Sequence, residues 1–330
     1  MKETLNHLIQ HKTLTTDQAK DIVINMANDQ YSDAQMAALL TTFIMRPITL
    51  DELRGFREGM LLLANKVDLS DYNPMDLCGT GGDGKDTFNI STLSSFITAG
   101  AGVPVAKHGN YGVSSISGSS SVMEMLGLPF KSTEAELKEQ LEAANICFLH
   151  APLFHPAMKR IAPVRKALGV KTFFNMLGPL TNPAQPKVQL VGLFNLELLR
   201  MYKYFLQAEN TQYSIIHALD GYDECSLTKT VKLINNKEEK IIDAAYFNTL
   251  PVLEEDIKGG RTVEESAYIF WQILKGKGTS AQNEVVLANS ALAINTYHPE
   301  LSILEAKEKA TESLFGGKAK QTFEILKDLR

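Results

Sequence analysis

A glycine-rich segment, which follows a short apolar run and precedes a Ser/Thr-rich run, carries the clearest chemical signal in the sequence. Residues 79–84 read GTGGDG, with four glycines in six positions. Glycine tolerates positive φ and lets a ligand come close to the backbone. Between a strand and a helix, such a loop directs backbone N–H groups at an anion, usually a phosphate. A plain turn is the alternative, but a turn needs only one or two glycines, so we predict an anion site here.

The loop differs from the familiar glycine-rich phosphate motifs. A P-loop needs Ser or Thr after its lysine, whereas Asp86 follows Lys85. Three of the glycines fit the G-x-G-x-x-G spacing of dinucleotide-binding loops, but Asp83 lies inside the loop. An acid beside a phosphate is unfavourable unless it serves sugar hydroxyls or a metal ion.

A second loop joins a cation to an amide and several hydroxyls. KHGN occupies residues 107–110, at the end of an apolar strand pattern over 103–107, and serines recur as far as Ser121. Lys107 can neutralise a phosphate, and the serines with backbone N–H groups can surround it. A serine-rich surface loop is the alternative. Two such loops on neighbouring strands favour a substrate with more than one phosphate.

Two adjacent acids lie in a third loop, which follows another predicted strand at 212–220. Asp223 and Glu224 could hold Mg²⁺, which takes one or two protein carboxylates together with substrate phosphates. Exposed Asp-Glu pairs are common and usually only solvated. The position after a strand, in a chain with two anion loops, favours the metal interpretation.

The elements that must position these groups fall into two parts. Residues 1–69 show only helical periodicity, which predicts a small helical domain or a dimerisation arm, completed by part of 165–186. Residues 70–330 alternate strands with helices, which predicts a large α/β domain with a mostly parallel central sheet. Ligands of such sheets bind at the carboxyl ends of the strands, so the loops are expected to share one cleft.

Further segments complete this outline. Strand patterns cover 75–78, 146–150 and 188–194, and two runs joined by the polar NNKE predict a β-hairpin over 228–247 at the sheet edge. A helix is predicted over 155–167, whereas 175–186 is too rich in Pro, Gly and Asn for regular structure. The latter is expected to form a hinge or crossover between the domains.

The composition excludes several classes of protein. The formal net charge of −5 gives no basic field for nucleic acid. No apolar run reaches the roughly 18 to 20 residues of a membrane span, and residues 1–10 lack the apolar core of a signal peptide. Three cysteines without a CxxC pair favour reduced thiols, hence a cytoplasmic protein without a membrane partner.

Taken together, the motifs resemble the anthranilate phosphoribosyltransferase family. GTGGD at 79–83, NIST at 89–92, KHGN with VSS at 113–115, VRKALGVKTFFNMLGPLTNP at 164–183 and the acid pair occur in the family's order, across nearly the whole chain. The resemblance implies a fold like that of the pyrimidine nucleoside phosphorylases, and a homodimer joined through the small helical domains. It also implies Mg²⁺-dependent transfer of a phosphoribosyl group from phosphoribosyl diphosphate to the amine of anthranilate, in tryptophan biosynthesis.

The resemblance assigns roles residue by residue. For phosphoribosyl diphosphate it implies contacts from Gly79, Gly82, Asp83, Thr87, Asn89, Ile90, Ser91, Thr92, Lys107, His108, Gly109, Asn110, Tyr111, Gly112, Val113, Ser114, Ser115 and Ser119. One or two Mg²⁺ ions would be held by Ser91, Asp223 and Glu224. Anthranilate would contact Gly79, Asn110 and Arg165, in a tunnel lined by His108, His155 and Pro179. The groups with catalytic roles would be Lys107, Arg165, Asp223 and Glu224.

One residue departs from the family pattern. The family usually has arginine after KHGN, whereas this chain has Tyr111. A cation is thereby lost beside the substrate cleft, and either binding is weaker or another cation substitutes.

Two other functions compete with this interpretation. A pyrimidine nucleoside phosphorylase would use inorganic phosphate and would not need Mg²⁺-binding acids. A nucleic-acid-binding relative would need a basic face, which the net charge of −5 disfavours.

Overall fold

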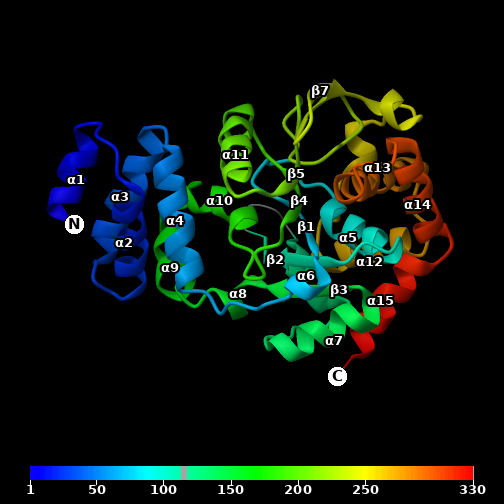
Figure 1. Cartoon of the computed structure of the whole chain (residues 1–330), viewed down its shortest axis with the longest axis horizontal. Helices are drawn as coiled ribbons and strands as arrows, with labels where there is room; N and C mark the ends of the chain where they lie inside the picture. The colour runs from blue at the N-terminus through cyan, green and yellow to red at the C-terminus, as the bar shows by residue number, and fades with distance from the viewer. Residues whose placement is uncertain (113–116, 330) are drawn as a thin grey trace. The chain divides into compact units, whose positions relative to one another are not determined.

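The computed structural model describes residues 1–112 and 117–329, which form two compact units (Figure 1). The first unit comprises Met1–Val67 and Ala151–Gln185, and the second comprises the rest of the chain. The second segment of the helical unit is longer than the part of 165–186 that the sequence suggested. It begins earlier because the helix Met158–Leu168 packs against the helices Thr16–Ala27 and Asp33–Met45, where Arg160 also forms ion pairs with Asp29 and Asp33.

The first unit is entirely helical. Its helices are α1 (Lys2–Ile9), α2 (Thr16–Ala27), α3 (Asp33–Met45), α4 (Leu50–Leu62), α8 (Ala151–Phe154), α9 (Met158–Leu168), α10 (Phe174–Leu177) and the 3₁₀ turn η2 (Gly178–Leu180). Capping boxes at Thr15, Ser32 and Thr49 begin α2, α3 and α4. The rings of Phe56 and Phe173 stack with centroids 4.0 Å apart, so both segments of the unit share one core.

The segment expected to be irregular is partly helical. Residues 174–180 form α10 and the turn η2, and only the part after Leu180 lacks helical structure up to β4. Pro179 stands in the first turn of η2, where its missing N–H group breaks no hydrogen bond. The proline and glycine content therefore shortened the helices without preventing them.

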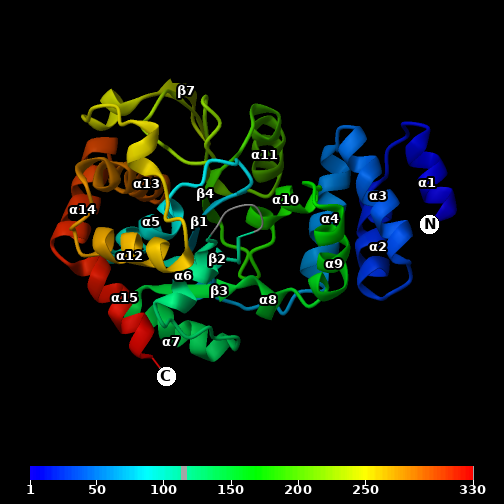
Figure 2. The same cartoon turned by 180° about the vertical axis from the view of Figure 1, so that it is seen from behind.

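The second unit contains a seven-stranded sheet. The strands are β1 (Met75–Gly79), β2 (Val105–Gly109), β3 (Ile146–His150), β4 (Val188–Gly192), β5 (Gln212–Ala218), β6 (Val231–Asn235) and β7 (Glu239–Ile242). Their order is β3-β2-β1-β4-β5-β6-β7, as Figure 2 shows for the labelled strands. Pairing is parallel from β3 to β5 and antiparallel from β5 to β7. The predicted mostly parallel sheet and its edge hairpin are confirmed.

The strand β2 extends further than the sequence predicted. Pairing with β3 continues through Gly109, opposite His150, so His108 belongs to the strand and not to the following loop. Lys107 accordingly lies in the middle of β2, opposite Phe148. Tertiary pairing, and not local sequence, decides where this strand ends.

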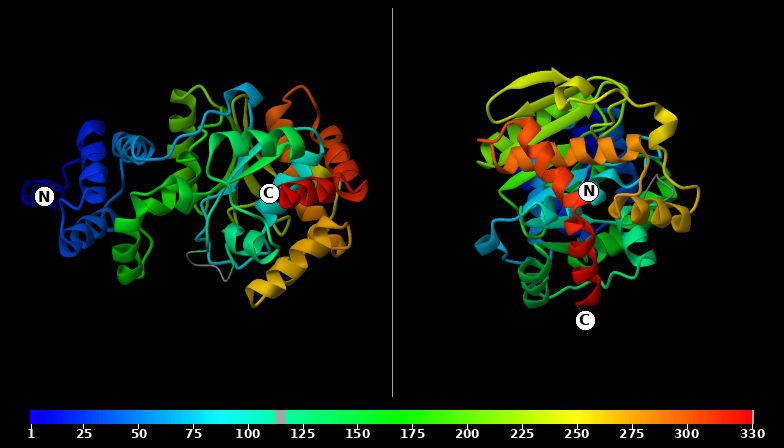
Figure 3. Two further views of the ribbon diagram at one scale, coloured as in Figure 1. Left: turned by 90° about the horizontal axis from the view of Figure 1, so that it is seen from below. Right: turned by 90° about the vertical axis from the view of Figure 1, so that its right-hand side faces the viewer.

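Helices cover the sheet and form the rest of the core. They are α5 (Ile90–Gly100), α6 (Ser119–Met125), α7 (Glu134–Ala144), α11 (Leu196–Ala208), α12 (Val263–Leu274), α13 (Ser280–Tyr297), α14 (Ile303–Phe315) and α15 (Lys318–Asp328), with 3₁₀ turns η1 (Ser70–Tyr72), η3 (Ala244–Phe247) and η4 (Glu254–Ile257). Helix α5 packs against β1 and β2 and against α13, α14 and α15, which are orange to red in Figure 3. Its residues from Thr92 to Ala99 are all buried, so the helix that follows the glycine loop is firmly held. Among the described residues, no helix is both long enough and apolar enough to cross a membrane.

Candidate active site

The backbone of the glycine loop adopts positive φ angles that favour glycine. It leaves the carboxyl end of β1 and leads to the first turn of α5. Gly81 and Gly82 adopt φ of +65° and +76°, a region that other residues rarely enter. The N–H of Gly81 thereby donates a hydrogen bond of 2.6 Å to Oδ2 of Asp223. The loop therefore directs the Gly81 N–H at an acid, which in this structure is the side chain of Asp223.

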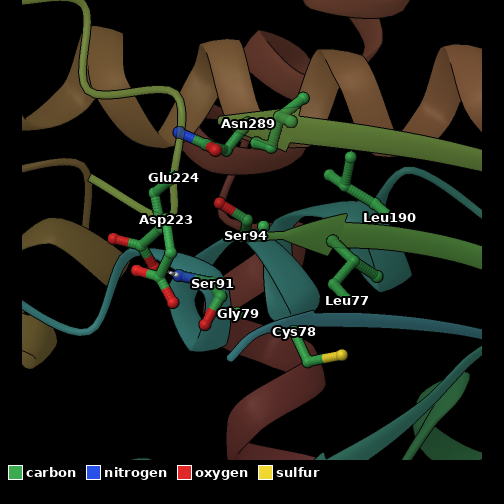
Figure 4. Close-up of a pocket in the computed structure, with 11 residues that line it drawn as sticks. Leu77, Cys78, Gly79, Ser91, Ser94, Leu190, Asp223, Glu224 and Asn289 are labelled. Carbon is green, nitrogen blue, oxygen red and sulfur yellow. Dashed lines mark hydrogen bonds between the residues drawn. The ribbon is translucent and has the colours of Figure 1, made fainter. Parts of the chain in front are cut away.

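The acid pair lies against this loop and the start of α5. The backbone N–H of Ser91 donates to Oε1 of Glu224 at 3.0 Å, and Oγ1 of Thr87 donates to Oε2 at 3.3 Å. Figure 4 shows the carboxylates of Asp223 and Glu224 beside Ser91 and Gly79. Residues more than 130 positions apart in the chain thus form one site, as the strand-end argument predicted.

The two carboxylates carry more negative charge than their surroundings neutralise. Burial raises the pKa of Asp223 to about 7, and the nearby charge of Asp83 adds to the effect. Burial also raises the pKa of Glu224 well above its ordinary value, with the charges of Asp223 and Asp83 as further causes. The N–H of Ser91 and the charge of Lys107 lower it only in part. A bound cation would relieve this repulsion directly.

This donor set fits Mg²⁺ shared with a substrate. Carboxylate and hydroxyl oxygens are its preferred ligands, and it usually keeps water and phosphate oxygens in its shell. Within the described parts of the chain, no group of three or more His, Cys, Asp or Glu side chains is arranged to hold a metal. The protein would therefore supply only part of the coordination shell, and a diphosphate could supply more.

Two glycines at neighbouring strand ends let the acid pair come this close. A methyl group at Gly79 would lie 2.3 Å from Oδ2 of Asp223, and one at Gly192 would lie 1.5 Å from the backbone oxygen of Asp223. Both positions exclude larger residues because the loop backbone and side chain occupy the space. Sequence reasoning missed Gly192. The available signal was a glycine inside the apolar strand pattern at 188–194, which often marks close backbone approach.

Replacing Gly192 with Ala is expected to displace the Asp223 loop, because neither backbone can move aside cheaply. We expect a loss of stability of about 1 to 3 kcal/mol, as for overpacked sites, and weaker Mg²⁺ binding. Calorimetry and metal titration would measure both effects. Gly178→Ala is the control, since a methyl group there meets nothing within 4 Å. Equal behaviour of the two variants would contradict this packing argument.

Lys107 is buried on β2, beside β1. Its Nζ donates a hydrogen bond to the carbonyl oxygen of Leu77 on β1, and the residue is only 3% exposed. The neighbouring N–H of His108 donates to Oδ1 of Asp76 at 3.3 Å. In this structure the ammonium group therefore contacts the backbone of β1, and its contact with a phosphate remains a prediction.

The second loop is held by its own polar groups. The N–H of Asn110 donates to Oγ of Ser119 at 3.1 Å, and this hydroxyl donates back to the Asn110 carbonyl at 3.2 Å. The side chain of Asn89 donates to the Ser117 carbonyl at 3.3 Å, which ties the two loops together. The predicted contacts at Val113, Ser114 and Ser115 lie outside the described residues.

Tyr111 contacts an acid and an aromatic stack. Its hydroxyl donates to Oε2 of Glu124 at 3.4 Å, and its ring meets that of His150 edge-on at 5.0 Å. His150 in turn stacks on Phe130 at 4.2 Å and bonds the Ser120 hydroxyl through Nδ1 at 2.8 Å. The aromatic residue thus anchors the loop by packing, where the family's usual arginine would supply a charge.

Not every residue of the first motif presents its side chain to a ligand. Ile90 and Thr92 are fully buried in the core of the unit, at 0% and 1% exposure, so neither residue is open to a ligand in this structure and their substrate contacts remain predictions. The other predicted contacts in the two loops are at least partly exposed or lie on β2; they are Gly79, Gly82, Asp83, Thr87, Asn89, Ser91, His108, Gly109, Asn110, Gly112 and Ser119.

The residues predicted to meet anthranilate beyond these loops belong to the helical unit. Arg165, on α9, donates from Nη2 to Oδ1 of Asn175 at 3.2 Å, and its guanidinium lies 5.3 Å from the centre of the Phe174 ring. Burial lowers the pKa of Arg165 to about 10. No ion pair joins it to a carboxylate among the described residues. A partly buried guanidinium without a carboxylate partner is suited to an anionic ligand.

His155 is buried in the same unit, at 4% exposure. Burial lowers its pKa to about 4, and a hydrogen bond with the Thr181 backbone opposes this shift. The unfolded chain binds a proton below about pH 6.5 that the folded chain does not bind until about pH 4. His155 therefore contributes stability above pH 6.5 that is lost as the pH falls toward 4.

We expect the wild type to lose about 3 kcal/mol more stability between pH 7 and pH 4 than His155→Gln does. Denaturant titrations at both pH values would measure the difference, because all other acid-sensitive groups are common to the two proteins. Parallel losses in the two proteins would contradict the buried neutral imidazole.

The class of protein follows from comparison with known families. Residues 71–320 match the family described as "Glycosyl transferase family, a/b domain", and residues 2–64 match "Glycosyl transferase family, helical bundle domain". The fold and site described above therefore define a two-domain glycosyl transferase.

Individual relatives narrow the class. The anthranilate phosphoribosyltransferase of Christiangramia forsetii is 58% identical, over 100% of this chain and 99% of the relative. The crystal structure of the Thermus thermophilus anthranilate phosphoribosyltransferase superposes with a TM-score of 0.91 at 30% identity, covering 98% of each chain. The chain belongs to the anthranilate phosphoribosyltransferase family, which confirms the resemblance read from its motifs. The Saccharomyces cerevisiae enzyme in complex with PRPP and Mg, at 23% identity and a TM-score of 0.91 over 98% of this chain and 96% of that chain, shows the same fold.

Proposed function

We propose that this chain transfers the 5-phosphoribosyl group of phosphoribosyl diphosphate to the amine of anthranilate, giving N-(5-phosphoribosyl)anthranilate and diphosphate in tryptophan biosynthesis. The observation that carries the proposal is the pairing of Asp223 with the glycine loop through Gly81, and of Glu224 with the start of α5 through Ser91, in a chain of this family. A diphosphate leaving group needs both features, because the loop supplies N–H donors and the acids supply metal ligands.

The reaction forms a bond from C1 of the ribose to the anthranilate nitrogen and breaks the bond from C1 to the diphosphate oxygen. The ribose develops oxocarbenium character, and negative charge develops on the leaving diphosphate. N–H groups of the glycine loop and the charge of Lys107 stabilise that charge. The aromatic amine is neutral at pH 7 and loses its proton only after attack, so no strong base is required. This agrees with a site in which positioning is the main task.

The metal would be held by Asp223, Glu224 and the hydroxyl of Ser91, as one or two Mg²⁺ ions. When bound, it would neutralise charge on the diphosphate. The excess charge of the acid pair supports this assignment, and the yeast relative was solved with PRPP and Mg. Arg165 would bind the anthranilate carboxylate through its fork of N–H donors, with His155 and Pro179 lining the approach.

The protein is further proposed to act as a homodimer in the cytoplasm. Ile9, Ile44 and Met45 of α1 and α3 are apolar and exposed, which supports association through the helical unit. The three cysteines are free, which agrees with a reducing compartment. Sedimentation analysis of the wild type and of Met45→Glu tests the dimer: the wild type should sediment as a dimer and the variant as a monomer.

The reaction is tested by the loss of anthranilate fluorescence on mixing with phosphoribosyl diphosphate, with Mg²⁺ and with EDTA. Fast loss that depends on Mg²⁺ is the expected result. Folded protein that shows no loss, yet cleaves a pyrimidine nucleoside with inorganic phosphate, would overturn the proposal in favour of a phosphorylase. A salt-sensitive shift of DNA by an inactive protein would favour the nucleic-acid-binding alternative.

A further inference from the structure

Asn289 is a buried amide that holds the backbone directly after the acid pair. It lies on α13, among apolar residues of the core, and is 3% exposed. Its Oδ1 accepts a hydrogen bond of 3.0 Å from the N–H of Cys225, and its Nδ2 donates one of 2.9 Å to the carbonyl of the same residue. Nδ2 also donates to the Val285 carbonyl at 2.8 Å. Figure 4 shows Asn289 lining the same pocket as Asp223 and Glu224.

The donor and acceptor pattern specifies an amide at this position. The N–H and the carbonyl of Cys225 need one acceptor and one donor side by side, as a neighbouring strand would supply. Carboxamide side chains offer both, and a third bond to Val285 uses the remaining donor of Asn289. If the Asn289 amide were flipped, its NH₂ group would face the Cys225 N–H and its oxygen would face the Cys225 carbonyl. An aspartate would set an anion against the Cys225 carbonyl, next to Glu224.

The segment that Asn289 holds carries two acids close to a third. Asp223 is buried and Glu224 is half-buried, and their carboxylates lie close to each other and to Asp83, which would repel them when all are charged. The glycine loop and α5 bond their carboxylates from one side. Asn289 bonds the backbone of the next residue, so the acid pair is held from two directions.

We propose that Asn289 is a positioning residue for the metal and diphosphate site, which fixes the Cys225 peptide and thereby the direction in which Asp223 and Glu224 face. This inference rests on the proposed function, because it assumes that the two acids bind a metal with the diphosphate substrate. Asn289 itself would contact neither the metal nor the diphosphate. A preorganised carboxylate pair binds a metal more tightly than one that must be ordered on binding.

The test is Mn²⁺ binding in the presence of phosphoribosyl diphosphate and without anthranilate, so that no turnover occurs. Free Mn²⁺ is measured by electron paramagnetic resonance. We expect Asn289→Ser to weaken Mn²⁺ binding by about tenfold, in the range seen when partners of metal ligands are removed. Asn289→Asp is expected to weaken it further. In steady state, the half-saturating Mg²⁺ and phosphoribosyl diphosphate concentrations should rise while the anthranilate KM changes by less than about twofold.

The control is Thr296→Val on the same helix. Thr296 is similarly buried, and its hydroxyl donates to the Leu292 carbonyl and pairs with the Ser214 hydroxyl, about two turns along α13 from Asn289. It should lower the melting temperature without changing Mn²⁺ binding. If Asn289→Ser loses stability but binds Mn²⁺ as the wild type does, the inference is wrong while the proposed function stands. Failure of the wild type to bind Mn²⁺ with this substrate would instead overturn the proposed function.

A wild-type measurement does not depend on the variants folding. Hydrogen exchange of the Cys225 amide should be slow, as for an amide in a sheet, and slower still with Mg²⁺ and phosphoribosyl diphosphate. Exchange at the rate of an exposed loop amide would overturn the inference.

Discussion

Replacing Asp223 with Asn together with Glu224 with Gln is expected to abolish Mg²⁺-dependent turnover and leave the fold intact. The amides keep the shape of the side chains but remove the charges that a cation would balance. A loss of at least about 10³-fold in kcat/KM is expected, since even one lost charge-stabilising contact can cost 10² to 10³. The fluorescence assay over a range of Mg²⁺ concentrations measures this directly.

The same variant should be at least as stable as the wild type when metal is absent. The pKa of Asp223, raised to about 7 by burial and by Asp83, means that the folded state prefers the protonated acid. Metal-free wild type therefore loses stability as the pH rises from about 4 to about 7, where the unfolded chain has already released the proton. The double variant lacks this cost, so its melting temperature in EDTA should exceed that of the wild type at pH 8 and approach it at pH 5.

Glu197→Gln, an exposed change on α11, is the control and should alter neither the Mg²⁺-dependent turnover nor the melting temperature. Full activity of the double variant would remove the metal assignment. A lower melting temperature than the wild type at pH 8 would show that the two carboxylates are stabilising, contrary to the charge argument.

Replacing Arg165 with Ala is expected to raise the anthranilate KM with a smaller loss of kcat. Hydrogen bonds to charged groups contribute about 1.5 to 3 kcal/mol, which corresponds to a rise of roughly 10- to 150-fold. The KM for phosphoribosyl diphosphate should change little. Arg165→Lys keeps the charge without the fork geometry, so its anthranilate KM should lie between those of the wild type and Arg165→Ala.

The surroundings of Arg165 indicate that its replacement affects ligand binding more than folding. Its guanidinium has one amide partner, Asn175, and an aromatic neighbour, Phe174. Burial lowers the pKa of this cation to about 10, so its removal relieves a cost of burial and should not unfold the helical unit. An unchanged anthranilate KM in a folded Arg165→Ala variant would refute the carboxylate-binding role.

Local sequence was sufficient to predict the structure of segments whose conformation depends mainly on their own residues. Thr133 and Glu136 form a capping box at the start of α7, a pattern that is visible in the sequence itself. Alternating apolar strands and helices predicted the mostly parallel sheet, and the turn around Asn235 predicted the edge hairpin. The glycine loop was also readable, because its positive φ angles admit few other residues.

Tertiary structure decided how these local pieces meet. The bond from Gly81 to Asp223 spans 142 residues, and no local pattern encodes it. Gly192 and Asn289 act through the close approach of other segments, so their importance depends on backbones distant in sequence. The end of β2 and the buried position of Lys107 follow from pairing with β3 and β1. The sequence by itself thus determined most of the helices and strands, the family and the groups that could do the chemistry. The burial of the acid pair, its raised pKa values and its backbone contacts arose only from packing, because they depend on neighbours in space.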